Sequence, residues 1–545
     1  MTTSRTGGEA LVHALLSHGI DTIFGLPGVQ NDYFYTAVYD ARDRMRVIHT
    51  RHEQGAAYMA LGYALASGKT GVFAVVPGPG FLNATAALST AYATNAPVLC
   101  LTGQLHSDHI GRGFGMLHEV PDQLGILRSL TKWARRVDSP ADVPRLVSEA
   151  LGAMHSDRPR PAGLEVPLNV FSRKAEFKDG HEPLSLSRPA VDDDAVERAA
   201  RLLGEASSPL ILIGGGAIDA GDEVQKLAEA LQAPVLASAS GRGILTSRHP
   251  FSHSYGPGRR LWEQADVAIS VGSRISTPMM RWGKPDRLRI IRVDIDPEEH
   301  SRFGPADVSL IADSRDALQA LLPALAAHNR DRPSRRVEML ALQDEMDAVY
   351  ESVQPQMGFV RAIREALPDD GIYVEDITQV GYVSRETMPV YRPRTYLTSN
   401  YQVTLGWSFP AALGAKVAAP DRPVLCVTGD GGFLFAATEM ATAVQHGINT
   451  VTVVFNDSAY GNVLRMQKQN YGGRVIASEL HNPDFVTFAE SFGAHGLRVN
   501  SPAELRQALV GAFAASAPVL IEVPVGEMPA PWEKMSAPTA RSKRD

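Results

Sequence analysis

Gly429-Asp430-Gly431-Gly432 limits the possible folds of this chain more than any other feature. The residues just before it, 423–428, are apolar or β-branched, as in a buried parallel strand. Residues 433–445 then carry apolar side chains at helical spacing, Gly447 is expected to end that helix, and residues 450–455 have the pattern of a second strand. This order predicts a strand–helix–strand unit whose two strands end at one edge of a parallel sheet.

Asp430 and Asp457 follow these two strands, 27 positions apart (457 − 430). Carboxylate oxygens suit Mg²⁺, and glycines let backbone amides approach an anion closely. Taken alone, Gly-Asp-Gly and Asn456-Asp457 would each usually form a turn. At the ends of two neighbouring strands they predict a site for a metal ion and a diphosphate.

This spacing resembles the motif of thiamine-diphosphate-dependent enzymes of the acetolactate synthase and 2-oxo acid decarboxylase group. The resemblance implies thiamine diphosphate and Mg²⁺ as cofactors, with the metal held by Asp430, Asp457 and the backbone carbonyl of Ala459. Asp457 stands where many members have asparagine, which adds a negative charge beside the metal. The resemblance further implies that these residues of the same region bind the cofactor: Gly429, Asp430, Gly431, Gly432, Asp457, Tyr460, Gly461 and Asn462.

Glu53 opens an Ala- and Gly-rich segment that we expect to be a helix, after a short strand ending at Val47-Ile48. A helix of small residues can pack closely against a flat ring or a partner helix. By itself a glutamate in a first helical turn only favours the helix dipole. In the resembled family this glutamate contacts the aminopyrimidine ring and promotes loss of the thiazolium proton by acid–base chemistry. The resemblance puts that role on Glu53.

Three further segments match the family in order and spacing: Gly25-Leu26-Pro27-Gly28, Gly78-Pro79-Gly80 and Thr102-Gly103-Gln104. A fourth, residues 403–412, resembles the segment whose large apolar side chain wedges between the two cofactor rings. Leu405 takes that position, although an ordinary core leucine would look the same. The resemblance thus adds cofactor contacts at Pro27, Gly28, Thr378, Gln379, Val403 and Leu405, and catalytic roles for Glu53, His118 and Gln104.

The residues leave the substrate open. Residues 272–277 lack the arginine of the Phe-Asp-Asp-Arg segment of acetolactate synthases, and Met466 replaces their specificity tryptophan. His118 aligns with a histidine of the decarboxylase branch, but a loop histidine in contact with solvent would look alike. Three alternatives remain: a carboligase or decarboxylase of a 2-oxo acid, a 2-hydroxyacyl-CoA lyase or synthase, and a non-catalytic subunit. Basic residues near the C-terminus favour the second only weakly: Arg541, Lys543 and Arg544.

The length of 545 residues is too great for one core. Alternating strands and helices predict an α/β fold of three doubly wound parallel-sheet domains. We expect a pyrimidine-binding domain at 1–171, a middle domain at 190–327 and a diphosphate- and Mg-binding domain at 357–530, with a polar linker at 172–194. The nearly identical heptapeptides 97–103 and 423–429 suggest that the first and third domains are built alike.

In the middle domain, Gly214-Gly215-Gly216 follows a strand as in a dinucleotide site. Asp219 stands where the third glycine of that fingerprint belongs, so FAD or ADP is possible there but not expected.

The composition is that of a globular protein, with 44% hydrophobic and 21% charged residues. The net charge of −7 argues against nucleic acid as a partner, and no apolar run has the length of a membrane span. The N-terminus lacks the apolar core of a signal peptide, and the only cysteines are Cys100 and Cys426, so a cytoplasmic location is expected. The resemblance implies a small 2-oxo acid substrate and a homodimer or homotetramer with active sites at the subunit interface.

Overall fold

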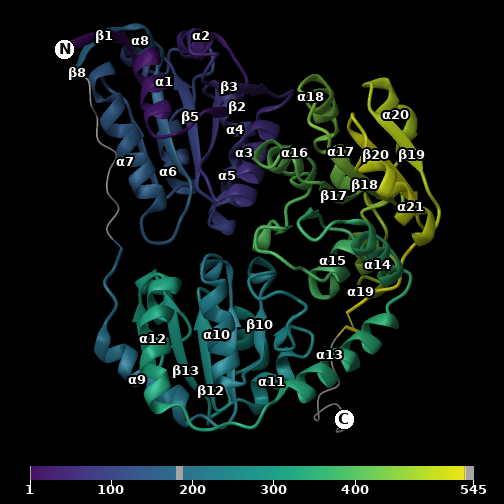
Figure 1. The fold of residues 1–545 in the computed structure, drawn as a ribbon. Helices are drawn as coiled ribbons and strands as arrows, with labels where there is room; N and C mark the ends of the chain where they lie inside the picture. The colour runs from purple at the N-terminus through teal and green to yellow at the C-terminus, as the bar shows by residue number, and fades with distance from the viewer. Residues whose placement is uncertain (1, 179–187, 533, 536–545) are drawn as a thin grey trace.

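Three α/β domains lie at the corners of a triangle in the computed structural model, which describes residues 2–178, 188–532 and 534–535 (Figure 1). Each domain has a six-stranded sheet in which every described strand pairing is parallel. Helices cover both faces of each sheet (Figure 1). The predicted fold of three doubly wound parallel-sheet domains is therefore confirmed.

The N-terminal domain carries the helix that begins with Glu53. Its sheet has the strand order β3 (Arg46–His49), β2 (Thr22–Gly25), β4 (Gly71–Val75), β5 (Val98–Gln104), β7 (Ala162–Pro167), β6 (Trp133–Arg136). Its main helices are α1 (Gly7–Ser17), α2 (Asp32–Asp40), α3 (Glu53–Ser67), α5 (Thr85–Thr94), α6 (Gln123–Leu130) and α7 (Val143–His155). A small antiparallel sheet of β1 (Thr2–Thr6) and β8 (Lys174–Lys178) extends past residue 171 into the expected linker, of which 179–187 lie outside the described residues.

The middle domain has a six-stranded parallel sheet of its own. Its sheet order is β11 (Ser252–His253), β10 (Val235–Ala237), β9 (Pro209–Ile213), β12 (Val267–Val271), β13 (Arg289–Asp294), β14 (Val308–Ile311), flanked by helices α9 (Asp193–Glu205), α10 (Gly221–Leu231) and α12 (Ser314–His328). Gly214 packs so closely that a Cβ there would lie 2.4 Å from the carbonyl oxygen of Gly272. Because α10 begins only at Gly221, the three glycines do not open a long helix; a nucleotide here stays a possibility that we do not expect.

The C-terminal domain follows helix α13 (Arg336–Glu351). Its sheet order is β16 (Tyr396–Leu397), β15 (Ile372–Glu375), β17 (Val424–Gly429), β18 (Val451–Asn456), β20 (Val519–Pro524), β19 (His495–Arg498). Its main helices are α14 (Gln356–Ala366), α15 (Gln379–Thr387), α16 (Ser408–Ala418), α19 (Gly461–Asn470), α20 (Phe485–Ser491) and α21 (Pro502–Ala512). Numbered by themselves, the strands of this sheet and of the N-terminal sheet follow the same order.

The similar construction of the first and third domains is thus confirmed, although the repeated heptapeptide does not mark equivalent strands. Residues 97–103 contribute to β5, the fourth strand of the N-terminal sheet, and residues 423–429 contribute to β17, the third strand of the C-terminal sheet. The repeat reflects only the shared need for a buried parallel strand.

Helices α3 and α16 join these two domains backbone to backbone (Figure 1). A Cβ on Gly62 of α3 would lie 1.9 Å from the carbonyl oxygen of Ala411, and a Cβ on Gly414 would lie 1.9 Å from that of Met59. Only glycine permits such an approach. The small residues after Glu53 therefore serve a partner helix, one of the two uses that their pattern predicted.

The single helix predicted at 433–445 is wrong. The structure instead has α17 (Asp430–Leu434), a 3-10 turn η9 (Ala437–Glu439) and α18 (Met440–Gln445), followed by Gly447 at φ +60°, as expected for a helix stop. The break turns Glu439 towards the N-terminal domain, where its buried carboxylate accepts hydrogen bonds from backbone amides. A contact between domains thus overrides the local helical pattern.

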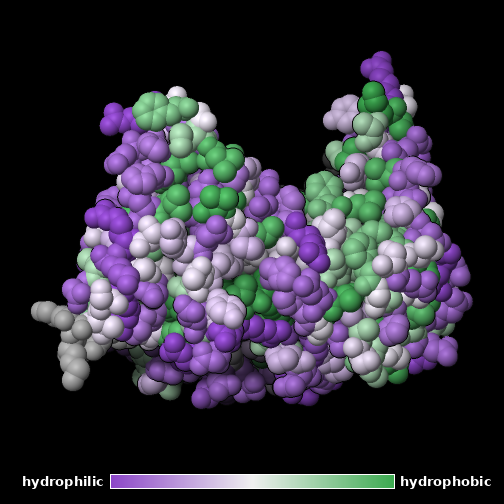
Figure 2. All heavy atoms as spheres, turned by 90° about the horizontal axis from the view of Figure 1, so that it is seen from above, coloured by the Kyte–Doolittle hydropathy of each residue, from purple (hydrophilic) through white to green (hydrophobic). Residues whose placement is uncertain are grey.

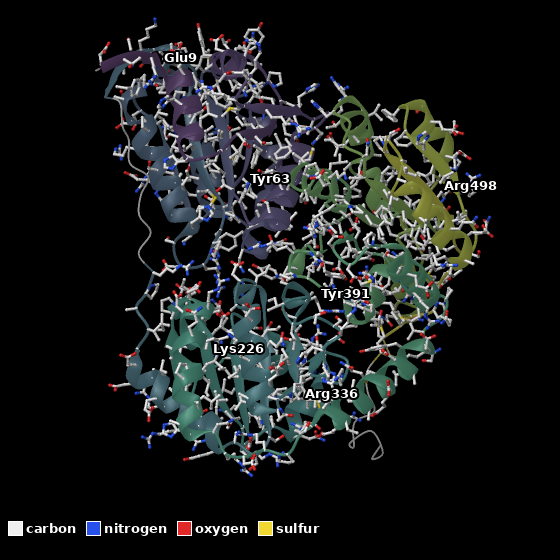
Figure 3. All side chains as sticks on the ribbon, viewed as in Figure 1. Glu9, Tyr63, Lys226, Arg336, Tyr391 and Arg498 are labelled. Atoms are coloured by element: carbon white, nitrogen blue, oxygen red, sulfur yellow. The ribbon has the colours of Figure 1, made fainter. Side chains whose placement is uncertain are left out.

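Charged and aromatic side chains hold the middle domain to its neighbours. Tyr391 lies at the boundary with the C-terminal domain (Figure 3), where the guanidinium carbons of Arg248 and Arg364 stand 3.7 and 4.9 Å from its ring centre. On the other side, Arg158 of the N-terminal domain donates to Glu299 at 2.8 Å. Among the described residues, no helix has both the length and the apolar character that crossing a bilayer requires.

Candidate functional site

Asp430 and Asp457 meet at the carboxyl edge of the C-terminal sheet. Strands β17 and β18 are neighbours, with Gly429 opposite Phe455, so the residues after each strand lie side by side. Asp430 is the first residue of α17 and is 2% exposed. Asn482 Nδ2 donates to Asp430 Oδ2 at 2.6 Å and to Asn456 Oδ1 at 2.9 Å, which ties the two strand ends together.

The charge at this edge favours a cation. Burial, reinforced by the charge of Asp430, raises the pKa of Asp457 to about 6. Burial also raises the pKa of Asp430, against the hydrogen bond from Asn482. The Oδ1 atom of Asn482 is buried and has no hydrogen-bond partner among the described residues. Two crowded carboxylates offer oxygen donors of the kind that suits Mg²⁺, so the residues present fit this ion.

Glycines make the edge narrow. A Cβ on Gly431 would lie 2.6 Å from Cε1 of Tyr460, and a Cβ on Gly461 would lie 2.3 Å from Oδ2 of Asp457. Backbone amides can therefore come closer to a bound anion than a larger residue would allow. By contrast, a Cβ on Gly429 would meet nothing nearer than the Thr378 methyl group at 3.4 Å, so there is room beside Gly429.

Asp376 contacts residues 429–432, the glycine-rich turn into α17 that we call the glycine loop. Its carboxylate accepts hydrogen bonds from Ser408 Oγ at 2.6 Å and Thr428 Oγ1 at 2.9 Å, and a Cβ on Gly432 would lie 3.0 Å from it. Burial raises the pKa of Asp376 to about 6. The next helix, α15, begins at Gln379, whose Oε1 is buried without a partner among the described residues. Three adjacent strand ends, those of β15, β17 and β18, thus converge on one place.

The segment with the expected wedge residue bridges the two domains. Thr404 Oγ1 lies 3.1 Å from Thr90 Oγ1 of α5, and a Cβ on Gly406 would lie 2.4 Å from Cβ of Phe435. Leu405 is half-buried rather than enclosed in a core. Val403 has φ +51°, a left-handed conformation that is strained for a β-branched residue. Such strain is typical of functional segments.

Glu53 is the first residue of α3 and is half-buried in this chain. Asn83 Nδ2 donates to its Oε2 atom at 3.0 Å. A Cβ on Gly80 would lie 3.4 Å from Oε1, so the first turn of helix α4 (Pro79–Asn83) passes directly beside the carboxylate. The segment that follows β2 is equally tight at Gly28, because a Cβ there would lie 2.5 Å from Cγ1 of Val76. The Glu53 carboxylate thus lies among closely packed segments at this end of the N-terminal sheet.

His118 flanks the start of α4. Its backbone has φ +67°, and a Cβ on Gly78 would lie 2.5 Å from its carbonyl oxygen. Its Nδ1 lies 3.1 Å from Oε1 of Gln30, and Gln30 Nε2 donates to Leu117 at 3.1 Å, so the ring is held in place. Gln104 is buried, and its side-chain oxygen accepts from the backbone amide of Leu105 at 2.7 Å.

The sequence analysis did not identify the amide side chains that hydrogen-bond to Asp430 in the C-terminal domain and to Glu53 and His118 in the N-terminal domain. Asn482 lies 52 positions from Asp430, Asn83 lies 30 positions from Glu53, and Gln30 lies 88 positions from His118. Gln123 accepts from Gly78 N and donates to Gly103 O, joining two of the matched segments. No periodicity or spacing marks these residues; only the folded chain brings them to their partners.

We expect Asp457→Asn to retain Mg²⁺ and thiamine diphosphate, because an amide oxygen also coordinates Mg²⁺. A carboxyl whose pKa is raised on folding contributes stability at low pH that is lost as the pH rises through the raised value, here about 6. In metal-free protein the variant should therefore melt higher than the wild type at pH 7.5, and the difference should shrink as the pH falls and vanish only below the ordinary aspartate value of 3.8, as calorimetry would show. Complete loss of metal and cofactor from this variant would make the assignment of Asp457 wrong.

Three family models match the three domains. The N-terminal TPP binding, central and C-terminal TPP binding domains of thiamine pyrophosphate enzymes match residues 5–126, 196–321 and 376–523. The chain is 34% identical over 528 residues to a probable 2-ketoarginine decarboxylase of Pseudomonas aeruginosa, which covers 95% of this chain and 94% of that protein.

Two acetolactate synthases are similar over nearly the same length. A probable acetolactate synthase large subunit of Methanocaldococcus jannaschii is 33% identical over 548 residues, covering 95% of this chain and 91% of that protein. The acetolactate synthase isozyme 1 large subunit of Escherichia coli is 31% identical over 538 residues, covering 95% and 93%. With all three domains matched and the likeness running through almost the whole chain, this protein belongs to the thiamine pyrophosphate (thiamine diphosphate) enzyme family.

Proposed function

We propose that the protein is a thiamine-diphosphate- and Mg²⁺-dependent enzyme that cleaves the bond next to the carbonyl of a 2-oxo acid, as a decarboxylase or a carboligase. The observation that carries the proposal is the pair of crowded carboxylates, Asp430 and Asp457, at adjacent strand ends that Asn482 ties together through Asp430 and Asn456. Thiamine diphosphate, when bound, supplies the nucleophilic carbon and the electron sink for such a cleavage.

The side chains of this chain divide the remaining work. Asp430, Asp457 and the Ala459 carbonyl would hold Mg²⁺, and the glycine loop would bring backbone amides to the diphosphate. Glu53 would exchange a proton with the pyrimidine ring while the amide of Asn83 keeps its carboxylate oriented. Cofactor contacts also stay predictions at Pro27, Gly28, Thr378, Gln379, Tyr460, Gly461 and Asn462. The same holds for the contacts of Val403 and Leu405 with the two cofactor rings.

His118 is proposed to hold the substrate carboxylate or to deliver a proton after carbon dioxide leaves, because an imidazole ring can both donate a hydrogen bond and transfer a proton. We expect His118→Phe to keep the cofactor and the assembly but to lower turnover by at least about tenfold. Acid–base groups typically contribute ~10²–10⁴-fold, so tenfold is the smallest loss consistent with this role. Steady-state rates with the best 2-oxo acid would measure this. Gln30→Ala, which frees the ring without removing it, serves as the partial variant, and unchanged rates for His118→Phe would leave it as a packing residue.

The substrate is best found by a screen of 2-oxo acids, with and without acyl acceptors. The names of the relatives suggest both a decarboxylase and an acetolactate synthase. Two features favour an acyl group or acceptor other than that of acetolactate synthases. Residues 272–277 lack the arginine of their Phe-Asp-Asp-Arg segment, and Met466, which is 44% exposed on α19, replaces their specificity tryptophan. Release of an aldehyde, formation of a longer ketone and cleavage of a 2-hydroxyacyl thioester would distinguish the alternatives. Turnover in none of these assays would point to a non-catalytic subunit. Arg541, Lys543 and Arg544 lie outside the described residues.

We expect the smallest active unit to be a homodimer in which Glu53 of one chain and Asp430 of the other serve one site. Figure 2 shows a hollow between two lobes with hydrophobic side chains on the facing walls. Large hydrophobic side chains are also exposed at Leu117, which precedes His118, and at Phe435, which packs against Gly406. Sedimentation at assay concentration should find no active monomer.

Mixing two inactive variants tests the shared site directly. A dimer of Glu53→Gln and Asp430→Ala chains would keep one site with both native residues, so activity should reappear on mixing. If each chain holds a complete site, mixing restores nothing.

A further inference from the structure

Glu439, a buried residue of the C-terminal domain, accepts hydrogen bonds from the backbone at the start of helix α3. Its Oε1 accepts from the backbone amides of His52 at 3.0 Å and Arg51 at 3.2 Å. Its Oε2 accepts from Arg51 N at 3.1 Å and from Thr442 Oγ1 at 2.5 Å. The residue is 0% exposed. These hydrogen bonds stabilise the negative charge of the Glu439 carboxylate, which would be costly to bury without partners.

Helix α3 is shaped to receive this carboxylate. Gly55 is its third residue, and a Cβ there would lie 2.3 Å from Oε1 of Glu439. Any larger residue would push the carboxylate away from the amides. The negative charge also lies at the amino end of the helix, where the helix dipole favours it.

The two amides that Glu439 holds come immediately before Glu53. The backbone from which the Glu53 carboxylate projects is therefore fixed from two sides, by Glu439 through Arg51 and His52, and by Asn83 at the carboxylate itself. Catalytic groups work only when they are held within about 0.5 Å of their productive position.

We propose that Glu439 is a positioning residue for Glu53. The proposal rests on the function proposed above. Glu439 lies nine positions after Asp430 (439 − 430), at the end of the segment that begins with the metal site. Within one chain, this segment thus joins the metal-binding edge to the helix that activates the cofactor. In the proposed dimer those two ends belong to different active sites, so the contact also links the sites.

The test compares Glu439→Ala and Glu439→Gln with the control Glu299→Ala. The control removes another fully buried carboxylate that ties the N-terminal domain to a neighbour, through Arg158. Amide hydrogen exchange in the cofactor-free protein reports on residues 51–55. In protein loaded with thiamine diphosphate and Mg²⁺, exchange of the thiazolium proton reports on Glu53, and titration gives the affinity for both.

We expect Glu439→Ala to speed amide exchange at 51–55 and to slow thiazolium proton exchange by about 10–100-fold, the size of effect that a small misplacement of a catalytic group produces. Cofactor affinity should change by less than about threefold, since the metal site is untouched. Glu439→Gln should lose less, because its amide oxygen can still accept from both backbone amides. The control should change neither exchange rate.

Wild-type thiazolium exchange in Glu439→Ala, or a loss of cofactor binding as large as its loss of exchange, would overturn the positioning role. If Glu439→Ala does not fold, Gly55→Ala displaces the same carboxylate without removing it and should give the same slow exchange. Glu53→Gln is measured in parallel. If that variant alone exchanges normally, the proposed function fails; if only the Glu439 and Gly55 variants do, this inference fails and the function stands.

Discussion

Replacing Asp430 by alanine should abolish the retention of Mg²⁺ and thiamine diphosphate. Asp430 is buried at the head of α17, where a bound Mg²⁺ would neutralise much of the diphosphate charge. Residues that merely orient metal ligands are worth about 10–100-fold in affinity, so loss of a ligand should cost more than about 100-fold. Equilibrium dialysis with Mg²⁺ and thiamine diphosphate would measure the loss.

Asp457→Asn and Asn482→Ala complete this experiment. The first keeps an oxygen ligand and should bind normally. The second removes only the amide that donates to Asp430 Oδ2 and should lie between the wild type and Asp430→Ala. A circular dichroism spectrum like that of the wild type would show that the variants are folded. One tightly held cofactor per chain in Asp430→Ala would refute the proposed metal site.

Glu53→Gln should leave cofactor binding largely intact but slow exchange of the thiazolium proton by ~10²–10⁴-fold, the usual range for acid–base groups. The glutamine keeps an oxygen that can accept from Asn83, so its position is preserved while its ability to exchange a proton is lost. The proposed metal ligands and the glycine loop belong to another domain, so we expect them to be unaffected. NMR after acid quenching measures the exchange.

Asn83→Ala is the matched variant, since it keeps the carboxylate and removes only the hydrogen bond that orients it. We expect a loss of exchange smaller than that of Glu53→Gln. Near-normal exchange in Glu53→Gln would remove Glu53 from the mechanism, whereas equal losses in both variants would indicate that orientation matters more than proton transfer.

The sequence by itself determined the fold class and the edge of the sheet where Asp430 and Asp457 come together. Buried parallel strands need apolar runs, and Asp430 and Asp457 follow two such runs with one crossover between them. Residues that lie next to one another in sequence, such as Gly429 to Gly432, keep their relation in any fold that contains this unit.

Tertiary structure alone decided which side chains support these motifs and how the helices near them end. Asn482, Asn83 and Glu439 approach their partners only after distant segments pack, and their hydrogen bonds leave no periodic trace in the sequence. The helical pattern of residues 433–445 is broken at η9, where Glu439 meets the N-terminal domain. Local patterns record which faces of an element are buried, whereas a hydrogen bond between domains depends on an arrangement that exists only once the whole chain has folded.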